Sequence, residues 1–403
     1  MLTLDKVYHA AYILRECARK TDLIASPNLS ENFCPSLYLK TENLQVTGSF
    51  KLRGAYYKIS QLSEEEKEKG IVACSAGNHA QGVAMAATKK GIKSTICMPD
   101  SAPVMKVEST RRLGANIELV KGAYDDAHDR AVQLVSETGA TFIHPYDDDL
   151  VIAGQATIGL EILDQLEDVE AVIVPIGGGG LISGVSFAVK SLKPSVKVYG
   201  VQAAGAPSMF ESFNAHERKC LSSVSTFADG IAVKNPGENT FEIISKYVDD
   251  IVCVSEDEIA AAILALIEKQ KLIAEGAGAV PVAAAMFKKL PIEGKKTVCV
   301  VSGGNIDVNI LSRVITRGLM MTGRNVNLTI ELVDKPGQLQ QVSKIIADCG
   351  ANVVSVYYDH GDTNMAITSC FLKLALETRD SDQIETIKQE LGKAGFRIVT
   401  ERV

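Results

Sequence analysis

Short β-rich runs alternate with amphipathic helical stretches from Ile71 onward, and this alternation constrains the fold more than any other feature of the sequence. Helical crossovers between parallel strands produce this rhythm. The runs typical of strands are Ile71–Cys74, Ser94–Met98, Asn116–Val120, Thr141–Ile143, Ala171–Pro175, Lys197–Gln202 and Thr297–Val301. The helical stretches include Val104–Leu113, Ala123–Glu137, Val151–Leu166 and Ser255–Lys271. The sequence therefore predicts an α/β protein with doubly wound parallel sheets, and two sheets rather than one very wide sheet.

The rhythm changes past Arg324, where the expected elements follow in the order βαββαβ. Their ranges are Asn327–Val333, Gln338–Cys349, Val353–His360, Met365–Leu374, Asp380–Ala394 and Arg397–Val403. This ferredoxin-like order makes a complete small domain. Gly323 and its polar neighbours predict a linker near Thr322–Arg324. We therefore expect a larger domain over residues 1–321, with a smaller subdomain at about 52–146, and a second domain over residues 325–403.

The charge of the chain argues against two classes of partner. The 403 residues carry a formal net charge of −7, with acidic and basic residues mixed along the sequence. Nucleic acid or an anionic membrane surface would require a basic stripe, and the sequence contains none. We therefore expect a small-molecule ligand.

The sequence predicts neither a membrane segment nor an export signal. The longest apolar run, Gly276–Phe287, is shorter than the ~20 residues of a spanning helix and contains Pro281. The segment Met1–Arg19 carries charges throughout, unlike a secretory signal. Nine cysteines occur without a Cys-x-x-Cys pair, and we expect reduced core residues without a redox or metal role. These features predict a cytoplasmic protein.

A tetraglycine turn, Gly177-Gly178-Gly179-Gly180-Leu181, is the sharpest candidate binding feature. It follows the strand Ala171–Pro175 and opens a helix over Leu181–Lys190, where backbone N–H groups and the helix dipole favour a phosphate. The spacing fits neither the dinucleotide fingerprint, since Ser183 replaces its final glycine, nor a nucleoside-triphosphate loop. We expect a different phosphorylated ligand, although a tight turn beside a closely packed helix gives the same pattern.

Two further loops, Ser75–Gly82 and Ser302–Asn305, also follow strands and offer N–H groups and polar side chains to an anion such as a carboxylate. Upstream, Ser49 is placed to cap a helix and to put Lys51 in its first turn, where the dipole disfavours a cation. That position favours the neutral amine, which is the form that reacts with an aldehyde. A solvated surface lysine would give the same local sequence.

These segments, in this order, resemble the fold-type II pyridoxal-phosphate enzymes, and among them the threonine dehydratases, over nearly the whole chain. The resemblance implies a catalytic domain like that of tryptophan synthase β and pyridoxal 5'-phosphate as the cofactor. In the family the lysine of Ser-Phe-Lys-x-Arg-Gly, here Lys51, holds the cofactor, with Phe50 against the ring. The other matching cofactor positions are Asn78 at the hydroxyl, Gly177, Gly178, Gly179, Gly180 and Leu181 at the phosphate, Ser302 at the pyridine nitrogen and Gly230 at the ring. The positions matching the substrate loop are Ser75, Gly77, Asn78 and His79.

The resemblance implies deamination of L-threonine to 2-oxobutanoate and ammonia, and of L-serine to pyruvate. A hydroxyl at Ser302 does not keep the pyridine nitrogen protonated, so elimination from Cβ is favoured over transamination. Serine racemases have a second serine where this chain has Ala76, so racemisation is not expected. Their divalent-metal site uses an acidic residue where this chain has Gln202, so we expect no metal there.

The roles of two residues stay open. His79 fits an acid or base, but also carboxylate orientation or simple packing. Glu275 could reach the cofactor from a helix start, or the helix dipole alone could favour it there.

The C-terminal segment resembles an ACT domain through Asp334-Lys335-Pro336-Gly337-Gln338-Leu339, between its first strand and helix. Such domains bind amino acids, usually at subunit contacts. The matching effector positions are Gly337, Gln338, Leu339 and Asn352, with isoleucine, valine or a nucleotide as expected effectors in a homodimer or homotetramer. A purely structural dimerisation module fits the same sequence.

Two alternatives to a threonine dehydratase remain. One is a serine-specific dehydratase or another member that eliminates or replaces a β-substituent, such as a relative of cysteine synthase. The other is a non-catalytic amino-acid-sensing protein whose C-terminal domain carries the function.

Overall fold

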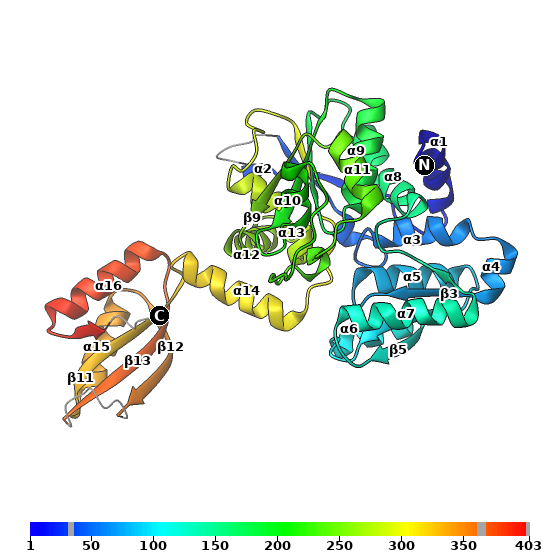
Figure 1. Cartoon of the computed structure of the whole chain (residues 1–403). Coiled ribbons are helices and arrows are strands. Elements are labelled where there is room, and N and C mark those ends of the chain that lie inside the picture. Colours follow the sequence, from blue (N-terminus) through cyan, green and yellow to red (C-terminus); the bar gives the residue numbers. More distant parts are fainter. Residues whose placement is uncertain (31–35, 361–367, 400–403) are drawn as a thin grey trace. The chain divides into compact units, whose positions relative to one another are not determined.

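The computed structural model describes residues 1–30, 36–360 and 368–399 and divides into two compact units, Met1–Asp307 and Val308–Val403 (Figure 1). The sequence places residues up to 321 in the larger domain. The division instead counts helix α14 (Val308–Met321) with the second unit, where it packs against strand β11 (Asn325–Val333).

The first unit contains a six-stranded sheet in the order β1-β2-β10-β7-β8-β9. Its strands are β1 (Leu23–Ala25), β2 (Leu37–Lys40), β7 (Ala171–Pro175), β8 (Lys197–Ala203), β9 (Asp250–Val254) and β10 (Thr297–Val300). All neighbouring pairs are parallel except β1 and β2. The helices that accompany it are α1 (Leu4–Leu14), α2 (Pro27–Ser30), α8 (Asp149–Gln165), α9 (Gly180–Leu192), α10 (Ser208–Ala215), α11 (Glu238–Tyr247), α12 (Glu256–Ala265) and α13 (Gly276–Met286), with short turns η1 (Glu42–Leu44), η2 (Asp229–Ile231) and η3 (Leu266–Gln270).

A second, four-stranded sheet in the same unit is fully parallel, in the order β5-β4-β3-β6. Its strands are β3 (Ile71–Cys74), β4 (Ser94–Pro99), β5 (Asn116–Val120) and β6 (Thr141–Phe142), and its helices are α3 (Lys51–Ser60), α4 (Glu64–Lys69), α5 (Asn78–Lys89), α6 (Val104–Arg112) and α7 (Tyr124–Thr138). Both faces are covered, because alternate residues of β3 enter different cores: Ile71 and Ala73 pack on the α5 side, Val72 and Cys74 on the α7 side. In Figure 1 this subdomain is the blue-to-cyan group of elements from α3 to α7.

The predicted pair of parallel sheets is confirmed. The strands predicted at Ile71–Cys74, Asn116–Val120 and Ala171–Pro175 have those bounds in the structure. Strands β1, β2 and β9 were not predicted.

Helices α3 and α8 approach each other closely, because glycines face each other where they cross. A Cβ on Gly54 would lie 2.7 Å from the Val151 carbonyl oxygen, and a Cβ on Gly154 would lie 2.6 Å from the Arg53 carbonyl oxygen. The first residue of α3 is Lys51, so this packing helps to set the position of that lysine.

A buried ionic network also fixes α3 against its neighbours. The guanidinium of Arg53 donates to both oxygens of Glu42 at 2.8 Å and to Glu161 Oε1 at 2.6 Å. Lys40 Nζ donates to the other oxygen of Glu161 at 2.6 Å. The neighbouring guanidinium outweighs burial and lowers the pKa of Glu42, so this carboxylate stays ionised inside the protein. The network joins β2, η1, α3 and α8.

The second unit has the order β11-α15-β12-β13-α16-β14 and confirms the predicted βαββαβ arrangement. Its remaining elements are α15 (Gln338–Asp348), β12 (Asn352–Asp359), β13 (Ser369–Glu377), α16 (Ser381–Lys393) and β14 (Arg397–Val399), and the sheet order is β12-β13-β11-β14, antiparallel throughout. Residues 365–367 and 400–403 of two predicted strands lie outside the described residues. Alternate residues of β13, including Cys370, Leu372 and Leu374, form the core with the helices.

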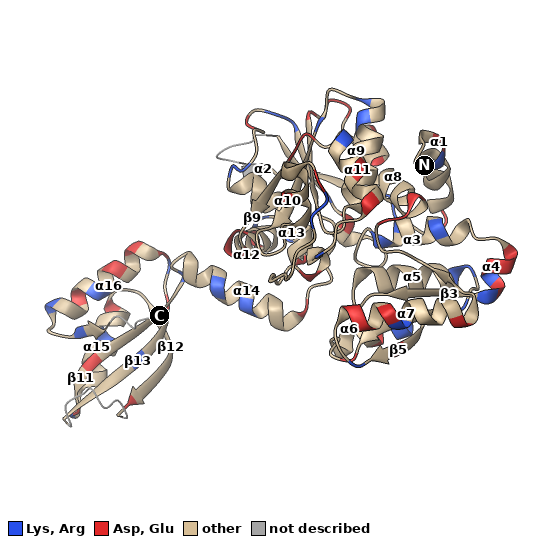
Figure 2. Cartoon of the chain, viewed as in Figure 1, with Lys and Arg blue, Asp and Glu red and all other residues tan. Residues whose placement is uncertain are grey.

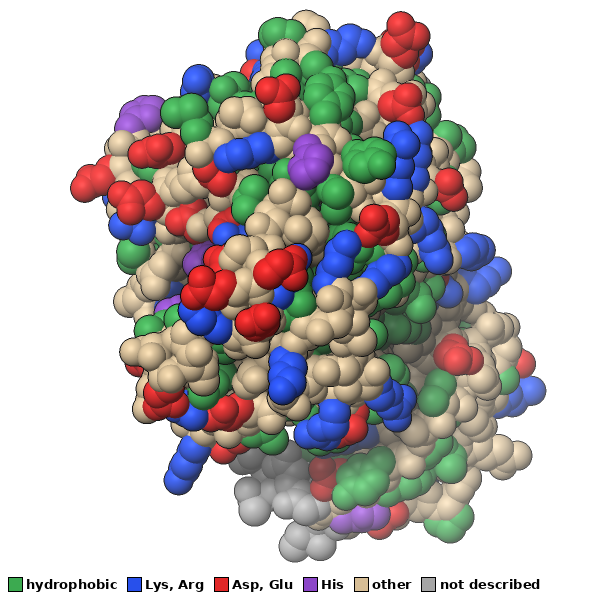
Figure 3. Space-filling view, turned by 90° about the vertical axis from the view of Figure 1, so that its right-hand side faces the viewer, with side chains coloured by type: hydrophobic (Ala, Val, Ile, Leu, Met, Phe, Trp, Pro, Cys, Tyr) green, Lys and Arg blue, Asp and Glu red, His purple; other side chains and the backbone are tan. Residues whose placement is uncertain are grey.

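Charged side chains of both signs are interspersed over the surface. Figure 2 shows acidic and basic residues alternating along helices such as α4 and α16, and the face in Figure 3 mixes charged and apolar side chains. Among the described residues, no helix is both long enough and apolar enough to cross a membrane.

Candidate active site

A cavity of about 530 Å³ lies in the first unit, where loops at the carboxyl ends of strands from both sheets meet. This volume falls within the roughly 300–1,000 Å³ usual for small-molecule sites. The structure brings together at its wall every position that the sequence suggested for cofactor and substrate. They are Phe50, Lys51, Ser75, Gly77, Asn78, His79, Gly177, Gly178, Gly179, Gly180, Leu181, Gly230 and Ser302.

Lys51 begins helix α3 and is partly buried in this cavity. Its Nζ donates a hydrogen bond to the Pro145 carbonyl oxygen at 2.7 Å and lies 5.4 Å from the centroid of the Phe50 ring. Burial lowers the pKa of Lys51 to about 8, against the opposing effect of the Glu275 carboxylate. A substantial fraction of this amine is therefore neutral at mildly alkaline pH and can act as a nucleophile.

The predicted capping role of Ser49 is wrong. The residue before the helix is Phe50, in a helical conformation and without a side-chain capping bond. Ser49 instead forms an isolated β-bridge with Gly303, and its buried hydroxyl has no hydrogen-bond partner among the described residues. Long-range pairing with the Ser302–Asn305 loop has replaced the local cap, so the start of α3 is positioned by tertiary contacts.

The tetraglycine loop leads into helix α9 without any side-chain cap and without an acidic residue in the first turn. Gly179 has a φ of +100°, and a Cβ there would lie 2.8 Å from Thr240 Oγ1. A Cβ on Gly178 would overlap the Tyr146 ring at 2.4 Å. Only glycine fits these positions, and the N–H groups of the first turn have no intrahelical partner. The loop is thus suited to an anion.

The Ser75–Gly77 loop leads into helix α5 in a similar way. Ser75 Oγ accepts a hydrogen bond from the Gly77 N–H at 3.1 Å. Gly77 precedes the helix without a capping side chain, and a Cβ there would meet nothing within 4 Å. The amino end of α5 therefore faces open cavity space, where its dipole favours a carboxylate.

His79 is buried and uncharged. Its Nε2 lies 2.8 Å from the Ile143 carbonyl oxygen and so donates to it, while no described residue bonds to its buried Nδ1. Burial, with the positive charge of Lys51, lowers the pKa of His79 to about 3. Of the three roles that the sequence left open, acid–base chemistry, orientation of the carboxylate and packing, these contacts favour packing over acid–base chemistry.

Three polar side chains from distant segments form a chain of hydrogen bonds at the wall of the cavity. Asn78 Nδ2 donates to Glu275 Oε1 at 2.7 Å, and Asn78 Oδ1 accepts from Asn305 Nδ2 at 2.8 Å. Asn305 Nδ2 also donates to the carbonyl oxygen of Thr47 at 2.8 Å. Burial and the nearby Asp229 raise the pKa of Glu275 to about 7. Glu275 therefore points into the site rather than only favouring a helix start.

Two residues that line the cavity, Tyr146 and Lys106, were not predicted from the sequence. Tyr146 packs its ring on the tetraglycine loop and donates from its hydroxyl to the Asn235 carbonyl oxygen at 3.0 Å. Lys106, on α6 of the smaller sheet, pairs with Asp229, next to Gly230. Tyr146 lies in the loop that follows strand β6. Ligand sites in α/β proteins form at such strand ends, so this position could have identified Tyr146 from the sequence.

Ala76 and Gln202 are the two positions at which the sequence differs from the pattern of serine racemases. Ala76 lines the cavity and presents no hydroxyl. Gln202 is buried away from the cavity wall, and both ends of its amide are bonded: Oε1 accepts from the Phe210 N–H at 2.8 Å, and Nε2 donates to the Ile176 carbonyl oxygen at 3.3 Å.

The suggested effector positions do not converge within one chain. Gly337, with a φ of +93°, Gln338 and Leu339 lie at the start of α15, beyond the end of β11. Asn352 begins β12 and donates to Glu377 Oε2 at 3.0 Å, at the opposite end of the sheet. Eight residues of β12 separate the two ends, which is roughly 25 Å at 3.3 Å per residue.

Comparison with known proteins agrees with this geometry. The family model described as "Pyridoxal-phosphate dependent enzyme" matches residues 14–304. The chain is 50% identical over 398 residues to an L-threonine ammonia-lyase of Thermotoga maritima, covering 99% of each chain. Among solved structures, it is similar to the processed threonine deaminase isoform 2 of Solanum lycopersicum, with a TM-score of 0.74 and 38% identity over 79% of this chain and 90% of that one. It is also similar to maize serine racemase, with a TM-score of 0.74 and 33% identity over 79% and 98% of the two chains. The chain belongs to the family of pyridoxal-phosphate-dependent enzymes.

Proposed function

We propose that this protein is a threonine ammonia-lyase, which converts L-threonine to 2-oxobutanoate and ammonia and also accepts L-serine, giving pyruvate. The observation that carries the proposal is a partly buried lysine, Lys51, with a lowered pKa, facing a cavity with two separate anion-binding helix starts. One start suits a phosphate and the other suits the substrate carboxylate. The 50% identity to an L-threonine ammonia-lyase over the full chain supports this choice.

The residues of the cavity fit pyridoxal phosphate. The tetraglycine loop would hold the phosphate on unpaired N–H groups, and Lys51 would make the covalent link to the aldehyde carbon. Asn78 lies within the same wall for the ring hydroxyl, and Ser302 and Gly230 line it as well. When bound, the cofactor withdraws electrons from the substrate Cα and so allows its proton to be lost.

Lys51 would act twice. It would hold the cofactor through its Nζ, and its neutral amine, when free, would accept the proton from the substrate Cα. The lowered pKa suits this role, because a lysine with its ordinary pKa would be almost fully protonated and unable to accept a proton.

The neighbouring residues favour elimination over other outcomes. Ser302 lines the cavity with a hydroxyl, which would not keep the pyridine nitrogen protonated and so would disfavour transamination. Ala76 provides no hydroxyl to return a proton to the opposite face of Cα, as racemisation needs. Loss of the β-hydroxyl followed by hydrolysis then gives the 2-oxo acid and ammonia.

Replacement of Lys51 by alanine tests the proposal directly. We expect Lys51→Ala to lose the covalent attachment of the cofactor, with its borohydride-sensitive visible absorbance, and to lose threonine turnover while keeping a cooperative thermal transition. Lys58→Ala, on the same helix but paired with Asp148 outside the cavity, should retain both signals. Dehydration by Lys51→Ala near the unmutated rate would refute the role of this residue.

Substrate assays separate the proposal from its alternatives. Oxo-acid formation from threonine and serine, compared with sulfide-dependent product from O-acetylserine, distinguishes a threonine enzyme, a serine-specific dehydratase and a relative of cysteine synthase. A non-catalytic sensor would show no visible absorbance from bound cofactor and no turnover of any of the three.

We further propose that the second unit is an ACT domain that regulates the enzyme in a homodimer or homotetramer. The βαββαβ order and the Asp334–Leu339 segment support this assignment. Because Gly337 and Asn352 lie at opposite ends of one sheet, a single amino-acid effector could touch both only between two copies of the chain. Isoleucine, valine or a nucleotide are the effectors to test.

A further inference from the structure

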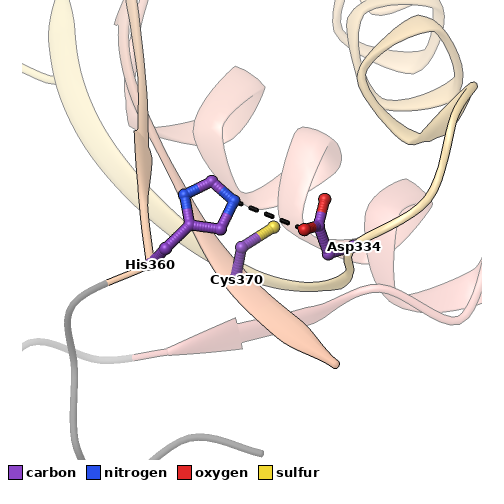
Figure 4. Close-up of side chains that lie close together, drawn as sticks. All are labelled: Asp334, His360 and Cys370. Atoms are coloured by element: carbon purple, nitrogen blue, oxygen red, sulfur yellow. Dashed lines mark ion pairs between the residues drawn. The ribbon is translucent and has the colours of Figure 1, made fainter. Parts of the chain in front are cut away.

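Three side chains of metal-ligating types meet at one end of the sheet of the second unit, and none of them lines the cavity. Figure 4 shows Asp334, His360 and Cys370 converging, with ligand atoms that all lie within 4.8 Å of one another. His360 Nε2 is 3.5 Å from Asp334 Oδ2. Among the described residues, this is the one group of three or more His, Cys, Asp or Glu side chains with such spacing.

The strand register explains why these residues converge. Cys370 on β13 pairs with Leu332 on β11, so Asp334, two residues further, lies diagonally from it on the same face. The pairing of Asp359 with Phe371 places His360 opposite Cys370 on the other neighbouring strand. The Asp334 N–H donates to the Thr368 carbonyl oxygen at 2.9 Å, which holds the end of β11 beside β13. The cluster is therefore built by the sheet itself.

One of the three side chains is buried and the other two are exposed, which suits a metal site at the surface of the protein. The Cys370 side chain is buried at 1% exposure within the core cluster, whereas the His360 and Asp334 side chains are each 55% exposed. The thiol would be fixed by packing, and the other two side chains can rotate toward it. The His360 ring is oriented by stacking on Tyr358, with an interplanar angle of 19°.

The donor set indicates the class of ion. One thiolate sulfur, one imidazole nitrogen and one carboxylate oxygen suit Zn²⁺ and similar borderline-soft cations, whereas Mg²⁺ and Ca²⁺ prefer oxygen alone. With Zn–ligand bonds of about 2.0–2.3 Å, tetrahedral ligand atoms lie roughly 3.3–3.8 Å apart. The observed spacing reaches this after a side-chain shift of about 1 Å.

We propose that Asp334, His360 and Cys370 form a binding site for Zn²⁺ or a chemically similar divalent cation, with the fourth tetrahedral position open to water or an exogenous ligand. The ion would join the ends of β11, β12 and β13 beside the turn Lys335–Gly337. This assignment departs from the sequence-based expectation that the cysteines have only a packing role. It is independent of the proposed reaction, because none of the three residues lines the cavity.

The test uses the full chain after chelator treatment. Isothermal titration with ZnCl₂ should show one saturable site per chain, and CoCl₂ should produce the near-ultraviolet thiolate-to-cobalt absorption. Zn²⁺ should also raise the melting temperature, because it binds only the folded chain. His360→Gln and Asp334→Asn should each weaken Zn²⁺ binding by about a hundredfold or more, since loss of even outer-sphere partners costs roughly 10–100-fold.

Cys370→Ser should abolish the cobalt charge-transfer band. The matched control is Cys220→Ser, which removes an exposed cysteine elsewhere and should leave the binding constant unchanged. If Cys370→Ser fails to fold, the two surface variants still decide the question. Absence of stoichiometric binding, or Zn²⁺ binding that His360→Gln and Asp334→Asn leave unchanged, overturns the proposal.

Discussion

At the scale of single residues, the site depends on groups whose ionisation is shifted by burial. Lys51 and Glu275 both line the cavity, and burial moves both pKa values toward neutrality, to about 8 and about 7. Each shift favours the uncharged form, which is the general effect of removing water from an ionisable group. The lysine is thereby a usable base, and the carboxyl group can hold a proton beside Asn78 at neutral pH.

Glu275 should make the stability of the apoprotein depend on pH. Its folded-state pKa is raised from 4.5 to about 7, so its stabilising contribution is fully present below about pH 4.5 and is lost as the pH rises through 7. The loss is on the order of 3 kcal/mol at 1.36 kcal/mol per pKa unit. Glu275→Gln, which stays neutral, should flatten this part of the profile.

Denaturant unfolding at a series of pH values between 4.5 and 8 measures this effect. Glu293→Gln, on an exposed segment, is the control and should leave the profile as it is in the unmutated chain. A Glu275→Gln profile that still falls by the same amount across this range would show that another group is responsible.

At the scale of secondary structure, the close crossing of α3 and α8 helps to position Lys51, the first residue of α3. Glycines at 54 and 154 leave room for backbone atoms where a Cβ would lie under 3 Å from a carbonyl oxygen. Backbone cannot move aside as a flexible side chain can, so added volume must displace a whole helix.

We expect Gly154→Ala to lower the free energy of unfolding by about 1–3 kcal/mol, the usual cost of overpacking. Because α3 begins at Lys51, the variant should also bind pyridoxal phosphate more weakly, as measured by its visible absorbance. Gly392→Ala is a matched control: that glycine lies in α16, and a Cβ there would meet nothing within 4 Å. The control should be more stable by about 0.5–1 kcal/mol. Equal effects of the two substitutions would contradict the crossing argument.

At the scale of the whole molecule, two compact units carry separate tasks in the proposed function. The cavity lies within the first unit, while the suggested effector positions lie at opposite ends of the sheet of the second. Coupling between them requires a demonstrated second binding site and a measurable difference in affinity. Self-association would be a condition for effector binding if Gly337 and Asn352 from two copies form one site.

Titration of the full chain with isoleucine, valine and ATP should therefore show saturable binding of at least one of them, with an affinity that rises with protein concentration as chains associate. Asn352→Ala and Gln338→Ala should each weaken it, while leaving threonine turnover without effector unchanged. If none of the three ligands gives a binding signal, or if both substitutions leave the affinity unchanged, the second unit is better described as a purely structural dimerisation module.

The family resemblance singled out Lys51, whereas the sequence by itself determined most strands of the two parallel sheets and the glycine loops. These depend on short-range rules: hydrophobic period, chain reversal at glycine, and anion binding where a helix follows a strand. The βαββαβ order of the second unit was readable for the same reason. Strands β1, β2 and β9 were missed, and two of them pair with strands from other parts of the chain, β2 with β10 and β9 with β8.

Only the tertiary structure decided which side chains act together. Glu275 bonds to Asn78 across 197 residues, Ser49 pairs with Gly303 instead of capping its helix, and Tyr146 closes on the tetraglycine loop. In the second unit, strand register brings Cys370 to His360 and Asp334. The physical reason is common to all of these cases. Burial and hydrogen bonding between distant segments shift pKa values and determine which side chains contact each other. No local sequence pattern shows which distant segments will come together.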